Sequence, residues 1–260
     1  MKQKIIVIKL GGSVITDKTK PYTARKKVIR RLVLEIKRSQ KQVIVVHGSG
    51  SFGHASASKY GGMHGYTSRW GIAKVARDAM TINAIVREIF LEEKLPVISL
   101  SPMSMMISKA GSLYDSFFSP LDCVLHQGLI PLLYGDGIWD LKWNTTIFSG
   151  ERVITEIVTY LQSKEYIVEK IIEVGHTKGV YDIDGMTITT ITEESFLSQQ
   201  ESIGNSLAQD VTGGMRHKVE EALFLAKMGV ETMIINGEIP IELFASLQNT
   251  PTKGTLVCQR

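Results

Sequence analysis

The stretch IKLGGSVITDK joins the end of an apolar run to two lysines and two glycines. Lys9 is the penultimate residue of that run, where a charged side chain is costly unless it is paired or faces a ligand. Gly11, Gly12 and Ser13 follow, and Lys18 comes after a polar Thr-Asp turn. A packed core strand has no need of such an ending. The combination therefore indicates a site that holds an anionic ligand.

Two further glycine-rich stretches follow apolar runs or open predicted helices. HGSGSFGH spans residues 47–54 and includes Ser49, Gly50 and His54, and DVTGGMRHK spans residues 210–218 and includes Gly214 and Lys218. Glycine lets backbone N–H groups approach phosphate oxygens without a Cβ in the way, and a helix that starts there adds the positive end of its dipole. One such stretch can be a simple turn. Three of them, each near a lysine or histidine, indicate a phosphate site.

The candidate cations are Lys9, Lys18, Lys218 and the imidazole of His54. Lys218 lies in the second turn of a predicted helix whose side chains lean toward its N-terminus, so its ammonium can reach a phosphate held near Gly214. Several cations around one polyphosphate favour phosphoryl transfer, whose transition state needs alignment and charge neutralisation. Taken alone, Lys18 or Lys218 could equally be a solubilising lysine, and a lone histidine is more often structural.

Neither common nucleotide-binding fingerprint fits the sequence. The pattern G-x-x-x-x-G-K-[ST] is not found, and GSGSFG has the form G-x-G-x-x-G but follows the second predicted strand and has no well-placed acidic residue about 20 positions on. We therefore do not expect a dinucleotide site.

The composition is that of an ordinary globular protein, with 260 residues, a formal net charge of +4, and 43% hydrophobic and 22% charged residues. We expect no nucleic-acid partner, because the basic run at residues 25–31 fits the exposed side of an amphipathic helix. We expect no membrane partner, because no apolar stretch approaches the roughly 20 residues that span a bilayer. Cys123 and Cys258 lie far apart, and Lys9 interrupts the N-terminal apolar run, so we expect reduced thiols and a cytoplasmic protein.

The elements that must position these residues alternate along the chain. Strands are predicted over residues 4–10, 42–48, 95–100, 129–135, 170–175, 230–236 and 254–258, and helices over residues 24–38, 68–94, 120–128, 150–163, 212–228 and 240–247. Residues 137–148 predict an antiparallel excursion and residues 182–190 a hairpin. This alternation predicts an α/β fold with a mostly parallel sheet covered on both faces. Ligands of such sheets bind beyond the carboxyl ends of the strands.

The motifs KLGGSVITDK, VVHGSGSFGH, YGD, SGE and DVTGGMRHK, in this order, resemble the amino acid kinase superfamily over essentially the whole chain. Within it the sequence is similar to the isopentenyl phosphate kinases, and Lys18 and His54 are the most diagnostic positions. The resemblance implies a three-layer αβα sandwich around a mainly parallel open sheet, as one domain over residues 1–260. It also implies an acceptor-binding lobe of about residues 1–165 and a nucleotide-binding lobe of about residues 166–260.

The resemblance implies roles for individual residues. The expected catalytic residues are Lys9, Lys18, His54 and Lys218; those expected to bind ATP are Lys9, Gly11, Gly12, Ser13, Gly50, His176, Gly214 and Lys218; and those expected to contact the acceptor are Ser49, His54 and Gly150. The implied reaction is direct in-line transfer of the γ-phosphoryl group from Mg²⁺-bound ATP to isopentenyl phosphate, without a general base and without a protein ligand for the metal. A homodimer is also implied.

The sequence departs from the family pattern at two places. Glu151 stands where the family has an aspartate after Ser-Gly, and we expect its longer arm to keep the charge that organises the lysines. His176 and Lys178 stand where the family has two aspartates, in a segment that lies by the nucleotide. The second departure leaves a non-catalytic nucleotide- or phosphate-binding homologue as one alternative.

The other alternative is a fosfomycin-type phosphonate kinase, which shares the lysine and the histidine. An apolar channel behind His54 favours a prenyl substrate, whereas a short polar cup favours the antibiotic. The apolar wall is expected from the predicted helix at residues 68–94. Met103, Met105 and Met106 could complete it, or they could be ordinary core residues.

Overall fold

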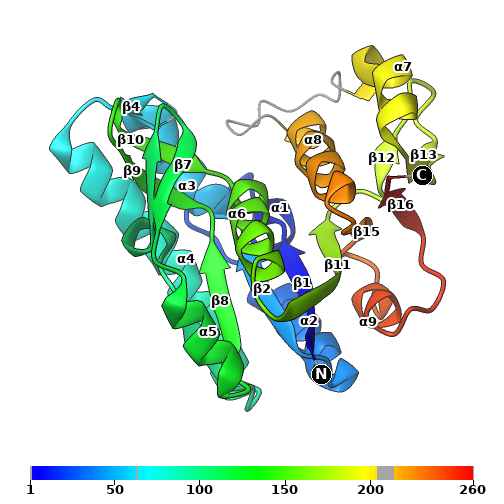
Figure 1. Ribbon diagram of the computed structural model, residues 1–260. Helices are drawn as coiled ribbons and strands as arrows, with labels where there is room; N and C mark the ends of the chain where they lie inside the picture. The colour runs from blue at the N-terminus through cyan, green and yellow to red at the C-terminus, as the bar shows by residue number, and fades with distance from the viewer. Residues whose placement is uncertain (1, 63, 204–213, 260) are drawn as a thin grey trace.

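The computed structural model describes residues 2–62, 64–203 and 214–259. In this part of the chain, the central feature is an eight-stranded sheet with the order β14-β16-β15-β11-β1-β2-β8-β5 (Figure 1). Its strands are β1 (Gln3–Leu10), β2 (Val43–His47), β5 (Val97–Ser99), β8 (Ile130–Tyr134), β11 (Tyr166–Gly175), β14 (Thr190–Ile191), β15 (Thr232–Asn236) and β16 (Gly254–Val257). The α/β class predicted from the sequence is confirmed.

The sheet is mostly parallel, as the alternating pattern predicted. β1 lies between β2 and β11 and runs parallel to both, so the carboxyl ends of these three strands meet at one edge. β16 is an exception because it pairs with β15 in the antiparallel direction. The edge where β1 and β2 end is where the first two glycine-rich stretches begin.

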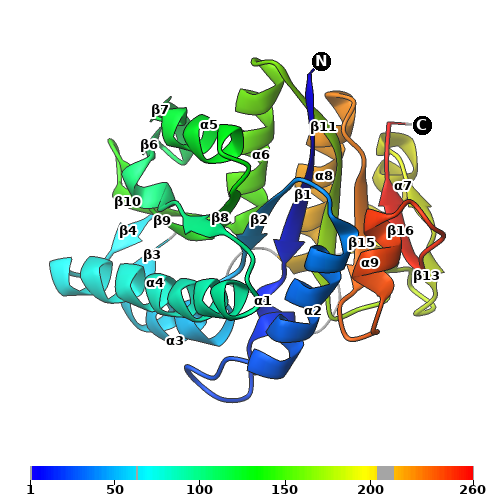
Figure 2. The same cartoon turned by 90° about the horizontal axis from the view of Figure 1, so that it is seen from below.

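Helices cover both faces of the sheet (Figure 2). They are α1 (Gly12–Ile15), α2 (Lys26–Ser39), α3 (Gly50–Tyr60), α4 (Arg69–Glu92), α5 (Ser119–His126), α6 (Gly150–Gln162), α7 (Glu193–Ile203), α8 (Gly214–Lys227) and α9 (Glu242–Leu247). Alternate residues of β1 face opposite sides: Ile6 and Ile8 pack with α2, α4 and α9, whereas Ile5 and Val7 pack with α5, α6 and α8. Burial on both faces explains why β1 reads as a continuous apolar run.

A smaller four-stranded sheet lies at the end of the molecule beside α3 and α4 (Figure 1). It contains β6 (Met106–Lys109), β7 (Ser112–Ser116), β9 (Asp136–Asp140) and β10 (Asn144–Phe148). The antiparallel pair β9–β10 confirms the predicted excursion. The hairpin β6–β7 was not predicted.

Among the described residues, two short strand pairs and a 3-10 turn complete the architecture. β3 (Gly61–Gly62) pairs with β4 (Gly65–Tyr66), and β12 (Val180–Tyr181) pairs with β13 (Thr187–Ile188) as the hairpin expected there. The 3-10 turn η1 (Pro102–Ser104) precedes β6. In the described ranges, no helix has both the length and the apolar character needed to cross a membrane.

The structure differs from the sequence-based prediction at one helix and decides between two alternatives elsewhere. No helix was predicted over residues 50–60, but α3 begins at Gly50 and carries His54 in its second turn. Met105 and Met106 do not line an acceptor channel; they are 6% and 1% exposed and belong to the hydrophobic core on the side of α5 and α6. The reading of these two methionines as core residues is therefore the correct one.

Candidate active site

One cavity of about 90 Å³ lies at the carboxyl ends of β1 and β2. Its wall comes from segments that are far apart in the sequence: the end of β1 and the residues after it, the start of α3, the start of α6, and α8. The lining residues are Lys9, Gly11, Gly12, Ser13, Lys18, Gly48, Ser49, Gly50, His54, Gly135, Ile147, Phe148, Ser149, Gly150, Glu151 and Lys218. The four predicted cations thus face a single space.

The floor of this cavity is a direct contact between two glycine-rich segments. A Cβ added to Gly12 would lie 2.6 Å from the backbone nitrogen of Gly50. A Cβ added to Gly50 would lie 2.1 Å from Thr16 Oγ1, and Gly50 also has a φ of +49°. Neither position can hold a side chain without displacing backbone. We call this contact the glycine joint.

Thr16 ties the glycine joint together through its hydroxyl group. Thr16 Oγ1 donates to the carbonyl oxygen of Gly12 at 2.6 Å and accepts from the backbone N–H of Ser51 at 2.9 Å. Residues on both sides of the joint are therefore held by one side chain. This fixes the start of α3 relative to the residues that follow β1.

α3 presents His54 to the cavity. Nδ1 of His54 lies 2.9 Å from the carbonyl oxygen of Gly50, four positions earlier. Because a carbonyl oxygen only accepts, Nδ1 carries a proton, and the ring orientation is fixed. α3 also starts at this cavity, so its positive N-terminal end adds to the local field.

Lys9 is held by two buried carboxylates. Its side chain is 5% exposed, its ammonium contacts Glu151, and its Nζ lies 3.8 Å from Glu173 Oε2. Glu151 follows the first residue of α6, and Glu173 is the direct neighbour of Lys9 across the β1–β11 pair. A buried ammonium needs such compensation. Glu151 of the Ser-Gly-Glu motif thus reaches Lys9, in agreement with the expectation that its charge organises the lysines.

The start of α6 meets α8 at the cavity. Ser149 caps α6 by accepting from the backbone N–H of Arg152 at 3.1 Å, and its Oγ also lies 3.0 Å from His217 Nε2. His217 directly precedes Lys218 on α8. This contact fixes the part of α8 that brings the Lys218 ammonium to the cavity wall.

A second cavity, of about 40 Å³, adjoins the first behind His54. The two share Ser49, His54, Gly135 and Ile147. The rest of the second wall is mainly apolar and comes from α3, α4 and β9: Gly53, Ala57, Val75, Ala79, Asp136 and Gly137. α4 thus supplies part of an apolar wall, as its sequence position led us to expect.

Asp136 is the charged group of this second wall. Burial raises the pKa of its carboxyl to about 7, although the backbone N–H groups of Met103 and Gly137 donate to it. The carboxyl is 3% exposed and sits at the first residue of β9. Near neutral pH it therefore exchanges a proton inside an apolar enclosure.

The structure places most predicted site residues at these cavities, with two differences. His176 is exposed just after β11, beside Glu238 and Arg25, and does not line the cavity described above. Gly214 is the first residue of α8 and also lies outside that lining. Residues 210–213 of the third glycine-rich stretch lie outside the described residues.

Several site residues were not singled out from the sequence. Asp136 belongs to the quoted YGD motif but had no assigned role. Glu173 sits within an ordinary apolar strand pattern, and its contact with Lys9 depends on the pairing of two strands distant in sequence. His217 carried a weak signal, since it adjoins Lys218. His47, by contrast, is fully buried, and burial lowers its pKa to about 4. Its Nε2 lies 3.1 Å from Asn83 Nδ2, in agreement with a structural role.

Comparison with known proteins agrees with this geometry. A model of the amino acid kinase family matches residues 4–236, and the chain belongs to this family. Within the family it is 29% identical to the isopentenyl phosphate kinase of Methanothermobacter thermautotrophicus, over 97% of this chain and 98% of that protein. It is 30% identical to the enzyme of the same name from Haloferax volcanii, over 85% of this chain and 88% of that protein.

Solved structures show the same likeness in three dimensions. A crystallographic study of isopentenyl phosphate kinase contains a chain that superposes with a TM-score of 0.81 at 27% identity, over 97% of this chain and 99% of that chain. The three-layer arrangement expected from the resemblance is therefore confirmed as the amino acid kinase fold.

Proposed function

We propose that the protein transfers the γ-phosphoryl group of ATP to isopentenyl phosphate and releases isopentenyl diphosphate and ADP. The observation that carries this proposal is the single cavity lined by Lys9, Lys18, His54 and Lys218, with an apolar cavity directly behind His54. The similarity to proteins named isopentenyl phosphate kinase supports the same acceptor.

The reaction needs alignment and charge neutralisation rather than a covalent intermediate. An oxygen of the acceptor phosphate attacks the γ-phosphorus in line with the departing β-phosphate oxygen, and the bond to ADP breaks as the new bond forms. The acceptor oxygen is already anionic near neutral pH, so no general base is required. The protein's task is to hold two polyanions end to end.

Each cation takes a place along this line. Lys9 and Lys218 neutralise the phosphates of ATP, which rest on Gly11, Gly12, Ser13, Gly50 and Gly214. Lys18 stabilises the phosphoryl group in the transition state of the transfer. His54, with Ser49 and Gly150, holds the phosphate of the acceptor. The N-termini of α3 and α6 both open onto the cavity and add favourable dipoles.

The glutamate and histidine positions refine this assignment. Glu151 and Glu173 keep the Lys9 ammonium in place when no phosphate is bound, because together they surround it. A protonated His54 would donate from Nε2 to a phosphate oxygen while Nδ1 keeps its bond to Gly50. His176 is proposed to face the nucleotide from the end of β11. In these roles the N-terminal lobe binds the acceptor and the C-terminal lobe the nucleotide.

Magnesium is proposed to accompany ATP, where it would lower the negative charge of the phosphates. Among the described residues that line the cavity, Glu151 is the acidic one, and its carboxylate already contacts Lys9. The donor set therefore fits an ion carried mainly by phosphate oxygens. In the described ranges, no group of three or more His, Cys, Asp or Glu side chains is arranged to hold a metal ion.

The wider setting follows from the family resemblance. We propose that the protein is a homodimer and that it is located in the cytoplasm. Sedimentation of the purified protein measures its oligomeric state. A fosfomycin-type kinase is less well supported, because apolar side chains, those of Ala57, Val75, Ala79 and Ile147, make up most of the wall of the cavity behind His54, although Asp136 also lines it. A non-catalytic homologue is less well supported. The residues that motivate it, His176 and Lys178, are exposed, whereas the four candidate cations line one cavity.

The deciding experiment is an ADP-release assay with purified protein and Mg²⁺-ATP. The acceptors are isopentenyl phosphate, dimethylallyl phosphate, geranyl phosphate and fosfomycin. We expect the highest kcat/KM with a short prenyl phosphate. Preferential turnover of fosfomycin would favour the antibiotic kinase, and ATP binding without ADP release above background for any acceptor would favour the non-catalytic homologue.

A further inference from the structure

Lys18 is carried by a loop whose base is closed by backbone contacts. Thr16 and Ala24 form an isolated antiparallel bridge, and the N–H of Asp17 donates to the carbonyl oxygen of Thr23 at 2.9 Å. Lys18 itself is exposed and directly follows Asp17, at the start of this loop. The bridge fixes where the loop starts and ends but does not by itself fix how the Lys18 side chain lies at the cavity.

Tyr22 directly precedes Thr23, so it lies on the returning arm of the loop, opposite Lys18. Its hydroxyl donates to Asp78 Oδ2 at 3.1 Å, and its ring lies edge-on to Phe52 with the centroids 5.7 Å apart. The Lys74 ammonium lies 4.9 Å from the centre of the same ring. Tyr22 has a φ of +53°, a left-handed conformation that is uncommon for a bulky residue and needs support from its surroundings.

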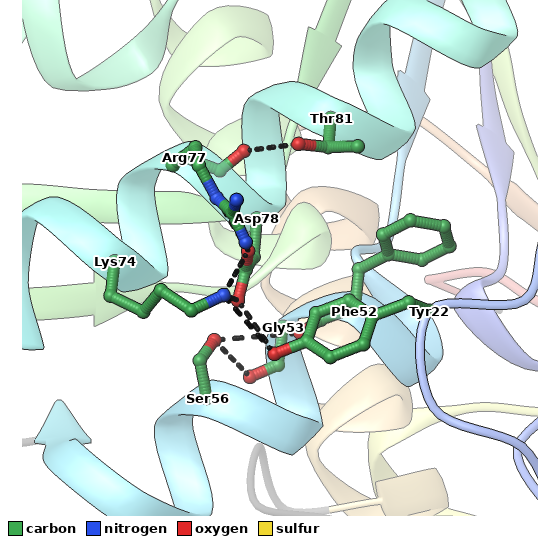
Figure 3. A network of polar contacts seen from close by, with 8 residues as sticks. All are labelled: Tyr22, Phe52, Gly53, Ser56, Lys74, Arg77, Asp78 and Thr81. Atoms are coloured by element: carbon green, nitrogen blue, oxygen red, sulfur yellow. Dashed lines mark hydrogen bonds and ion pairs between the residues drawn. The ribbon is translucent and has the colours of Figure 1, made fainter.

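Asp78 is the anchor for Tyr22 (Figure 3). It lies on α4 and is 0% exposed. Lys74 Nζ donates to its two oxygens at 2.8 and 2.9 Å, and Arg77 Nη2 donates at 2.7 Å. Burial raises the pKa of Asp78, but hydrogen bonds from Lys74, Arg77, Ser56 and Tyr22 outweigh burial and lower it. The anchor is therefore an ionised carboxylate.

The same cluster fixes α3. Phe52 and Ser56, which contact Tyr22 and Asp78, lie on either side of His54 along this helix. The backbone N–H of Thr23 also lies 3.3 Å from Ser51 Oγ, at the start of α3. The loop that carries Lys18 and the helix that carries His54 thus share one support on α4. We call the set Tyr22, Phe52, Ser56, Lys74, Arg77 and Asp78 the α4 anchor.

We propose that Tyr22, bound to Asp78, is a positioning residue that sets the Lys18 ammonium over the transferred phosphoryl group. The inference rests on the proposed kinase function, because it gives that function's catalytic lysine its place. A lysine on an exposed loop has many rotamers, and ordering it has an entropic cost. Misplacing a catalytic group by about 1 Å can cost about a hundredfold in rate.

The test compares Tyr22→Phe with a matched control, Tyr114→Phe. Tyr22→Phe keeps the ring between Phe52 and Lys74 and removes only the hydroxyl. Tyr114 also lies beneath a lysine ammonium, that of Lys109 at 5.8 Å, but it is 63% exposed on β7 and lines neither cavity. We expect Tyr22→Phe to lower kcat about tenfold, with the KM for ATP and the thermal midpoint near those of the control.

A double-mutant cycle with Lys18→Ala separates positioning from general stability. If Tyr22 acts through Lys18, removing its hydroxyl should change kcat by less than about twofold once the lysine side chain is gone. An equal fold-loss in the presence and absence of the Lys18 side chain would overturn the proposal. So would an unchanged kcat in the single variant Tyr22→Phe.

Hydrogen exchange provides a readout that needs no turnover. In the protein without substrate, we expect the amides of Asp17 and Thr23 to exchange about tenfold faster in Tyr22→Phe than in the wild type or in Tyr114→Phe. Unchanged exchange would overturn the anchoring even if activity falls. A wild-type protein inactive with every acceptor would contradict the proposed function, while the exchange rates would still decide the role of Tyr22.

Discussion

At the scale of single residues, the cavity contains cations held in different ways. Lys9 is buried between Glu151 and Glu173, whereas Lys18 is exposed on a supported loop. His54 is oriented by a backbone carbonyl within its own helix. The buried cation is fixed by charge, the exposed one by its loop, and the imidazole by helical geometry. Each therefore responds differently to substitution.

His54→Ala should affect the acceptor far more than the nucleotide. The imidazole lines both cavities, where the acceptor phosphate is proposed to lie, so we expect kcat/KM for isopentenyl phosphate to fall by about tenfold to a hundredfold. ATP affinity, measured by calorimetry, should change little. His126→Ala, at the exposed end of α5, is the matched control. An unchanged kcat/KM for the acceptor contradicts the role given to His54.

Asp136 predicts a dependence of stability on pH. Its folded-state pKa of about 7 lies above the ordinary value of an aspartate. The folded protein therefore binds more protons than the unfolded chain between these values, and the contribution of Asp136 is fully present at acid pH and lost as pH rises through about 7. The slope from this one group is at most about 1.4 kcal/mol per pH unit.

Chemical denaturation at several pH values measures this contribution. The free energy of unfolding of the wild type should fall more steeply between about pH 4 and about pH 7 than that of Asp136→Asn, which cannot titrate there. The comparison between the two proteins cancels the other titrating groups. Parallel curves for the two proteins would show that Asp136 keeps an ordinary pKa.

At the scale of elements, the sequence predicted the long periodic segments well. β1 and α4 could be recognised because their apolar residues repeat with strand and helix periods. α3 was missed because its sequence GSFGHASASKY is rich in glycine and serine, which are weak helix formers, and packing on α4 stabilises it instead. The β6–β7 turn was missed because Ala110 takes a positive φ that asparagine or glycine usually signals.

Residues of the candidate site could be predicted only where they belong to a local sequence motif. Lys9, Lys18, His54 and Lys218 lie within or close to glycine-rich stretches, so their neighbourhood in the sequence indicated them. Glu173 and the α4 anchor depend on contacts between segments that are distant along the chain, such as the pairing of β1 with β11. No spacing rule within one segment reports such contacts.

α4 should control the size of the acceptor. Ala79 is 2% exposed and lines the second cavity, so Ala79→Leu should fill space that a prenyl chain needs. We expect KM for isopentenyl phosphate to rise about tenfold while KM for ATP stays within about twofold. Met80→Leu, on the exposed side of the same helix at 56% exposure, is the control. Equal effects of the two substitutions would argue against a prenyl site here.

At the scale of the whole molecule, the cavity joins residues from both ends of the chain. Lys9 and Lys18 come from the N-terminal part, whereas Lys218 comes from α8. α8 is fastened to α6 by His217 at Ser149 and by Glu221, which accepts from Thr155 Oγ1. The central sheet is continuous from β2 through β1 to β11, so both proposed lobes share one backbone frame.

Lys218→Ala should abolish most activity without unfolding the protein. Its ammonium is proposed to neutralise ATP phosphates, so we expect kcat to fall by about a hundredfold or more and the thermal midpoint to stay near that of the wild type. Lys227→Ala, on the same helix and paired with Glu193, is the control and should keep full turnover. Turnover of Lys218→Ala equal to that of the control would remove α8 from the proposed mechanism.

The glycine joint has a consequence for how this family can diversify. The backbones of Gly12 and Gly50 are in direct contact, so a side chain at either position would clash with the other segment. Ala57, Val75 and Ala79 face an enclosure instead and can exchange one apolar shape for another. New acceptors should therefore arise through changes on α3 and α4, while the glycines of the proposed phosphate site stay unchanged.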